Sequence, residues 1–182
     1  MRVDDECFPN MNFRDYNGTG EWSRDAILER YSQYAHALGI TELRDLTPQV
    51  FPPGSARPTH IYSVMDEVIP GIEAGDLACI KIGIEYIGED QHFVFGRTLK
   101  SNTARALRRA PLSEEQAERV RKRIVNMLID GLIFREYREY AKLLRTLGFE
   151  EWWPYIEQNV DRQNPFVMRY YHYLDRHLRL GM

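Results

Sequence analysis

Positive charge is concentrated in one stretch of this sequence, from Arg97 to Arg123. The stretch holds nine basic and three acidic residues, so its formal charge is +6, whereas the rest of the chain holds 15 basic and 24 acidic residues. Clustered cations attract phosphates and acidic surfaces and speed association with them. The candidate residues for binding an anion or a partner are Arg97, Lys100, Arg105, Arg108, Arg109, Arg119, Lys122 and Arg123.

Two interpretations of this basic stretch stay open. It is a binding surface if residues 102–109 form a helix, because residues 100–103 would then lie at the N-terminus, where free N–H groups favour an anion. It is a structural feature if the acidic remainder of the chain neutralises it through ion pairs within the molecule. Bases of a single strand need aromatic side chains to stack on, and only Phe93 and Phe95 lie nearby. This scarcity argues against specific single-strand recognition.

Aromatic residues near the C-terminus are the second candidate for a site. They are suited to lining an apolar ligand pocket or a partner-binding groove, and packing in the core is the alternative use. The residues concerned are Trp152, Trp153, Tyr170, Tyr173 and His177. On a helix, His172 and His177 would be about 140° apart, too far to share one metal ion. We therefore expect no metal site, and the sequence contains no cofactor motif.

The composition is that of a folded domain rather than a disordered chain, with 43% hydrophobic and 28% charged residues among 182. Cys7 and Cys79 stand 72 positions apart, without the spacing of a metal or redox motif, which favours a reducing compartment. The N-terminal MRVDDEC lacks the basic and apolar regions of a signal peptide, and no apolar run is long enough to span a membrane. We expect a cytoplasmic protein that makes no membrane contact.

Helix start and stop signals recur along the chain. Ser113 to Gln116 forms a capping box, and the apolar stripe after it predicts a helix that Gly131 ends. A second helical pattern runs over 134–147, so the two predict a pair of antiparallel helices. Ser23 predicts a helix over about 24–38, and Asn164-Pro165 predicts a last helix to about residue 178.

Residues 77–98 fit two patterns. A period of 3.6 predicts a helix with Asp76 as its N-cap, whereas a period of two predicts a β-hairpin over 79–96. We favour the helix because few other strand candidates exist to pair with a hairpin. An internal similarity between residues 31–40 and 137–149 is compatible with a repeat. The predicted fold is mainly α, an irregular helical bundle or short helical array of about six or seven helices.

Residues 47–58 hold four prolines and form the best candidate boundary, between an N-terminal arm over 1–58 and a main helical body over 59–182 of one compact domain. The function we expect is non-enzymatic binding or regulation, in which a basic helical segment is presented to an acidic protein or a phosphate-bearing partner. A nucleic-acid-associated protein is the first alternative. An enzyme with a Tyr/Trp/His-lined small-molecule pocket and unknown catalytic residues is the second. A homo-oligomer is compatible with all three.

Overall fold

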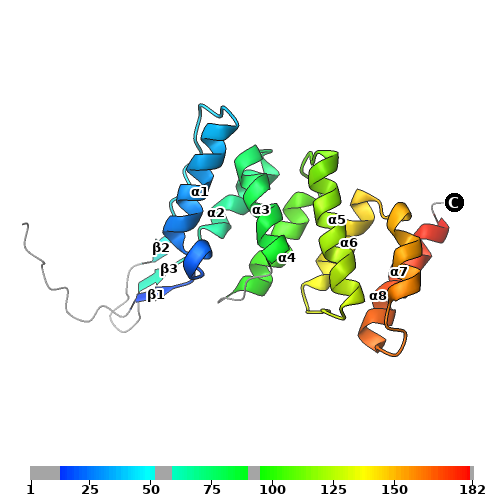
Figure 1. Ribbon diagram of the computed structural model, residues 1–182. Coiled ribbons are helices and arrows are strands. Elements are labelled where there is room, and N and C mark those ends of the chain that lie inside the picture. Colours follow the sequence, from blue (N-terminus) through cyan, green and yellow to red (C-terminus); the bar gives the residue numbers. More distant parts are fainter. Residues whose placement is uncertain (1–12, 52–58, 90–94, 181–182) are drawn as a thin grey trace, which may run out of the picture.

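Eight α-helices and a three-stranded sheet make up the part of the chain described by this computed structural model, which is residues 13–51, 59–89 and 95–180 (Figure 1). The helices are α1 Arg24–Ala37, α2 Met65–Glu73, α3 Leu77–Glu89, α4 Gly96–Leu107, α5 Glu114–Ile129, α6 Tyr137–Leu147, α7 Trp153–Asn159 and α8 Pro165–Leu180. The strands are β1 Phe13–Asp15, β2 Val50–Phe51 and β3 Thr59–Ile61, and two 3₁₀ turns are η1 Gly20–Trp22 and η2 Glu150–Trp152. The predicted mainly-α class is confirmed, with more helices than expected.

The helices form two layers along an elongated array (Figure 1). In one layer α3 packs between α1 and α5, and α5 reaches α7; in the other α4 packs between α2 and α6, and α6 reaches α8. The apolar core runs between the layers, where α3 packs on α2 and α4, and α5 packs on α6 and α8. The internal similarity noted above pairs α1 with α6, which lie in different layers. It therefore does not mark equivalent helices.

The antiparallel pair α5 and α6 is built as the sequence predicts. The Ser113 hydroxyl accepts a hydrogen bond from the Gln116 amide at 3.2 Å, and the Gln116 side chain accepts one from the Ser113 amide at 2.9 Å. Gly131 adopts a positive φ of 72° just after α5, which lets the chain reverse. Inside the pair, the buried Tyr137 hydroxyl donates to the Ile124 carbonyl at 3.0 Å.

Residues 77–89 are helical, so the hairpin alternative over 79–96 is wrong for this segment; residues 90–94 lie outside the described part of the chain. Asp76 caps the helix as predicted, since its carboxylate accepts from the amides of Ala78 and Cys79 at 2.9 and 3.0 Å. The alternating isoleucines arise because α3 is surrounded by α1, α2, α4 and α5 and is apolar nearly all round.

The strands lie at the N-terminal end of the array (Figure 1). β3 is the central strand, parallel to β1 and antiparallel to β2. β2 begins inside the proline-rich segment over 47–58, most of which lies outside the described residues. The sheet thus joins segments from before and after the candidate boundary.

A buried ion pair connects α4 to α6. The Lys100 ammonium lies 3.7 Å from a carboxylate oxygen of Glu136, and both side chains are only 2% exposed. Such a pair costs desolvation energy when formed, but loss of one partner leaves the other charge buried without compensation. The pair therefore constrains how α4 and α6 can pack.

We expect Lys100→Met to lower the free energy of unfolding by about 3–5 kcal/mol, because Glu136 would keep a buried charge without its cation. Adding Glu136→Gln should restore most of the loss. Arg97→Met, which removes an exposed cation from the same helix, should change stability by less than about 0.5 kcal/mol. Urea titrations of the four proteins measure this, and a double variant no more stable than Lys100→Met would contradict the explanation.

Candidate anion-binding site

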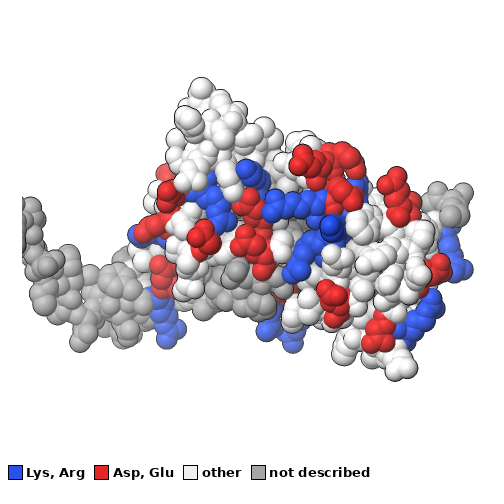
Figure 2. Space-filling model, in the orientation of Figure 1, with Lys and Arg blue, Asp and Glu red and all other residues white. Residues whose placement is uncertain are grey.

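Charge is divided unequally between the two layers. Helices α2, α4, α6 and α8 together carry nine basic and five acidic residues, whereas α1, α3, α5 and α7 carry seven basic and eight acidic ones. In Figure 2, which looks onto the side of α1, α3 and α5, side chains of both signs are interspersed. The excess of positive charge therefore belongs to the layer of even-numbered helices.

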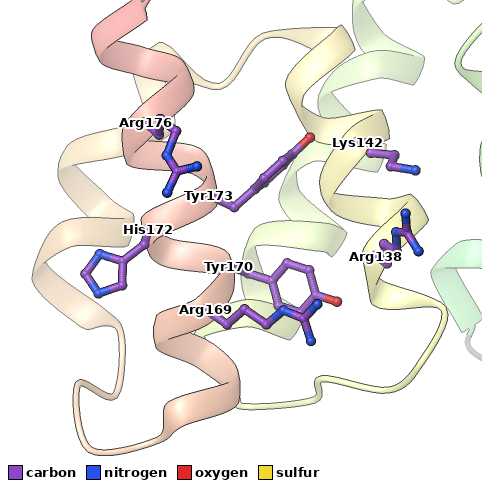
Figure 3. A pocket seen from close by; sticks show the side chains of 7 residues that line it. All are labelled: Arg138, Lys142, Arg169, Tyr170, His172, Tyr173 and Arg176. Carbon is purple, nitrogen blue, oxygen red and sulfur yellow. The ribbon is translucent and has the colours of Figure 1, made fainter.

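A pocket of about 340 Å³ opens between α6 and α8 on this layer (Figure 3). Its described lining residues are Arg138 and Lys142 from α6, and Arg169, Tyr170, His172, Tyr173 and Arg176 from α8. Four of them are cations, two are tyrosines, and no carboxylate is among them. The volume falls in the usual range of small-molecule sites.

Helical spacing aligns these side chains along the pocket. Arg138 and Lys142 are one turn apart on α6, and Arg169 and Arg176 are two turns apart on α8. In Figure 3 the two helices run in the same direction, and the rings of Tyr170 and Tyr173 lie on the side of α8 that faces α6. The site is thus built from two neighbouring rigid elements rather than from loops.

The cations of the pocket are poorly neutralised. In the described part of the chain, no ion pair involves Arg138, Arg169 or Arg176. Arg138 lies in the first turn of α6, where the helix dipole opposes a positive charge, so helix stability does not account for it. Desolvation raises the pKa of Tyr170, although the charges of Arg169 and Arg138 oppose this. The Tyr170 hydroxyl therefore stays protonated and is able to donate to an anion.

Glu139 connects the pocket to α4. One of its carboxylate oxygens lies 3.4 Å from Arg105 Nε and 3.6 Å from Arg108 Nη1, and the other lies 3.0 Å from Lys142 Nζ. Burial opposes ionisation of Glu139, but the hydrogen bond from Lys142 and the nearby charge of Arg105 outweigh it and hold the pKa of its carboxyl below the usual value. One buried carboxylate thus faces three cations.

Shared contacts with Glu139 and the shared pocket link cations from three successive helices, and we call this set the basic strip. It consists of Arg105, Arg108, Arg138, Lys142, Arg169 and Arg176. His177 lies beside it, accepting a hydrogen bond from Arg145 at 3.0 Å, and desolvation together with Arg145 and Arg176 lowers its pKa. The neutral imidazole leaves the local charge positive.

The basic stretch of the sequence is not a single surface. Arg105 and Arg108 belong to the basic strip, while Arg109 pairs with Glu73 of α2 at 3.3 Å. Lys100 is buried against Glu136, so its ammonium is not accessible to a binding partner in solvent. The proposed anion site at residues 100–103 is also wrong, because α4 begins at Gly96 and these residues lie in its interior.

The other predicted cations lie elsewhere. Arg97 is exposed in the first turn of α4, and α5 in the opposite layer carries the remaining three, which are Arg119, Lys122 and Arg123. Arg121, between them, pairs with Glu114 and Glu118. Part of the basic stretch is thus neutralised by carboxylates of the same molecule, as the second interpretation of the sequence predicts.

The residues of the predicted aromatic pocket do not all lie at one site. Tyr170 and Tyr173 line the pocket between α6 and α8, and His177 touches the Tyr173 ring with centroids 4.7 Å apart. Trp153 instead stacks on Tyr171, at 5.1 Å between ring centroids. Trp152 lines a separate depression with Glu114, Glu118 and Arg121, where its indole N–H donates to Glu118 at 3.3 Å.

Sequence reasoning missed four lining cations, which are Arg138, Lys142, Arg169 and Arg176. They escaped notice because each lies singly among tyrosines, carboxylates and apolar residues, so no local excess of charge marks them. One signal was available. Arg108, Lys142 and Arg176 recur every 34 positions, which lies in the range of helix-pair repeats.

Comparisons with family models, with curated proteins and with solved structures find no match to this chain. Within the residues described, no three His, Cys, Asp or Glu side chains gather as a metal site would need. None of the described helices combines the length and apolar character required to cross a bilayer. The arrangement of the basic strip is therefore the ground for a functional proposal.

We expect Glu139→Gln to lower the free energy of unfolding by about 1–3 kcal/mol at neutral pH, because three cations lose their shared carboxylate. The pKa of Glu139 is depressed in the folded state. Its contribution is therefore present above the pKa of about 4.3 of an unfolded glutamate and is lost as pH falls further. Unfolding titrations from pH 7 to about pH 3 should show the two proteins converging in acid. The exposed Glu115→Gln is the control, and a difference independent of pH would contradict the assignment.

Proposed function

We propose that this protein is a non-enzymatic binding protein that holds an acidic or phosphate-bearing partner on the basic strip. The observation that carries the proposal is the pocket between α6 and α8, whose described lining contains four cations and no carboxylate. Cations that serve only the fold are usually neutralised by nearby carboxylates, as Arg121 is by Glu114 and Glu118. Of the four pocket cations, only Lys142 has such a partner, Glu139, whereas Arg138, Arg169 and Arg176 form no ion pair within the described residues.

The chemistry of the lining suits phosphate oxygens. Arginine presents several N–H donors in a planar fork that matches phosphate, and Lys142 adds a compact charge. Arg138, Arg169 and Arg176 are exposed, so a partner can reach them from solvent. Tyr170 and Tyr173 are half-buried, and their hydroxyls offer neutral donors in the same pocket.

The proposal changes the binding surface predicted from the sequence. The basic stretch over 97–123 contributes only Arg105 and Arg108, both of which already share Glu139. The larger contribution comes from α6 and α8. A partner that follows the layer from α4 to α8 would meet cations on three successive helices.

Binding of long-chain inorganic polyphosphate tests the proposal. We expect Arg138→Gln/Arg169→Gln to weaken binding by about ten-fold at low salt, and to reduce the slope of log affinity against log salt by about 1–2, because two phosphate contacts are lost. The matched control Arg119→Gln/Lys122→Gln removes the same charge from α5 and should weaken binding less than about two-fold.

Fluorescence competition or calorimetry across a salt series measures both variants. Equal losses in the two variants would mean that net charge alone attracts the polyanion, which would refute a site on the strip. Failure of the parent protein to bind at low salt would refute the proposal outright.

A further inference from the structure

We infer that the phosphate-bearing partner is a single-stranded nucleic acid, with its phosphates on the basic strip and a base stacked at Tyr170 and Tyr173. This inference rests on the proposed function and names the class of partner. The geometry behind it is the placement of two aromatic rings inside the same pocket as four cations.

Aromatic rings among cations discriminate between kinds of polyanion. A polyphosphate or an acidic protein needs only the charges, whereas single-strand binders combine a positive groove with rings on which bases stack. Tyr170 and Tyr173 are three residues apart on α8, so they occupy neighbouring positions on one helix face (Figure 3). The objection drawn from the sequence, that aromatics are scarce beside the cations, applied to residues 97–123 and not to this pocket.

Both rings are held in place from the protein side. Tyr170 meets the buried Tyr137 edge to face, with centroids 4.9 Å apart and planes at 69°. Tyr173 meets His177 at 4.7 Å and 75°. Rings fixed in this way lose little conformational freedom when a base stacks on them. Arg169 also lies 5.8 Å from the Tyr170 ring centroid, close enough to contact a stacked base or its phosphate.

The pocket favours an unpaired strand over a duplex. Tyr170 and Tyr173 are half-buried between α6 and α8, so a ligand must insert a group to reach them. The bases of a duplex are already paired and stacked, and only its phosphates would meet the strip. A volume of about 340 Å³ takes one base with its sugar rather than a helix of nucleic acid.

The strip also sets the length of strand that it can contact. It crosses from α4 through α6 to α8, which is two helix-to-helix spacings of about 8–10 Å each. At about 3.4 Å per nucleotide of a stacked strand, this corresponds to about five or six nucleotides. A more extended strand would span the same distance with fewer nucleotides.

A test compares polyanionic ligands on the full chain. The probes are a fluorescent oligouridylate and an oligothymidylate of about eight nucleotides, a duplex of the same length, inorganic polyphosphate and a polyglutamate peptide. We expect both single strands to bind at least about five-fold more tightly than the duplex or the peptide. The ribose and deoxyribose strands distinguish RNA from DNA as the source of the ligand.

Variants separate stacking from charge. Tyr170→Leu/Tyr173→Leu should weaken single-strand binding by about ten-fold or more while changing polyphosphate binding less than about two-fold. The control Tyr155→Leu removes an exposed tyrosine of α7 and should change neither. Because Tyr170 packs on Tyr137, the single variant Tyr173→Leu and circular dichroism guard against a folding defect.

A length series on the parent protein does not depend on any variant. Affinity should rise steeply up to about six nucleotides and then level off, because the strip is then filled. Unaltered single-strand binding by the leucine variants, or tighter binding of the duplex or of polyglutamate, would overturn the inference and leave the proposed function standing. Binding of none of the probes would refute both.

Discussion

The carboxylate of Glu139 is the constraint on which the basic layer depends. It draws Arg105 and Arg108 of α4 and Lys142 of α6 to one point, and the buried pair of Lys100 and Glu136 joins the same two helices nearby. These charges help to determine how α4 packs on α6. One carboxylate cannot neutralise three cations, however, so the contact that orders the helices also leaves positive charge at the edge of the pocket.

The two-layer arrangement explains where that charge accumulates. In such an array every second helix belongs to the same layer, so residues roughly one helix pair apart in sequence become neighbours in space. Arg108, Lys142 and Arg176 are related in this way. A fold with a different order of helices would scatter the same residues, and the mildly acidic chain would show no basic surface.

Sequence reasoning succeeded where the physical cause is local. The side chains of Ser23, Asp76, Ser113 and Asn164 cap helices within three residues of themselves, so their signals can be recognised without knowledge of the fold. It failed where the cause is tertiary. The burial of Lys100 depends on Glu136 arriving from α6, and the pocket depends on α6 and α8 lying side by side. No local pattern encodes either contact.

The proposed anionic partner would meet a pocket whose positive charges are only partly balanced within the protein. Like charges at close range destabilise a fold, and α5 avoids this by surrounding Arg121 with Glu114 and Glu118. A glutamate one turn after Arg138 or Arg169 would neutralise these cations in the same way. The residues at these positions are instead Lys142 and Tyr173. Under the proposed function, an anionic ligand would relieve the repulsion among these cations and so stabilise the folded protein on binding. The same cations would then affect both the affinity for the ligand and the free energy of unfolding.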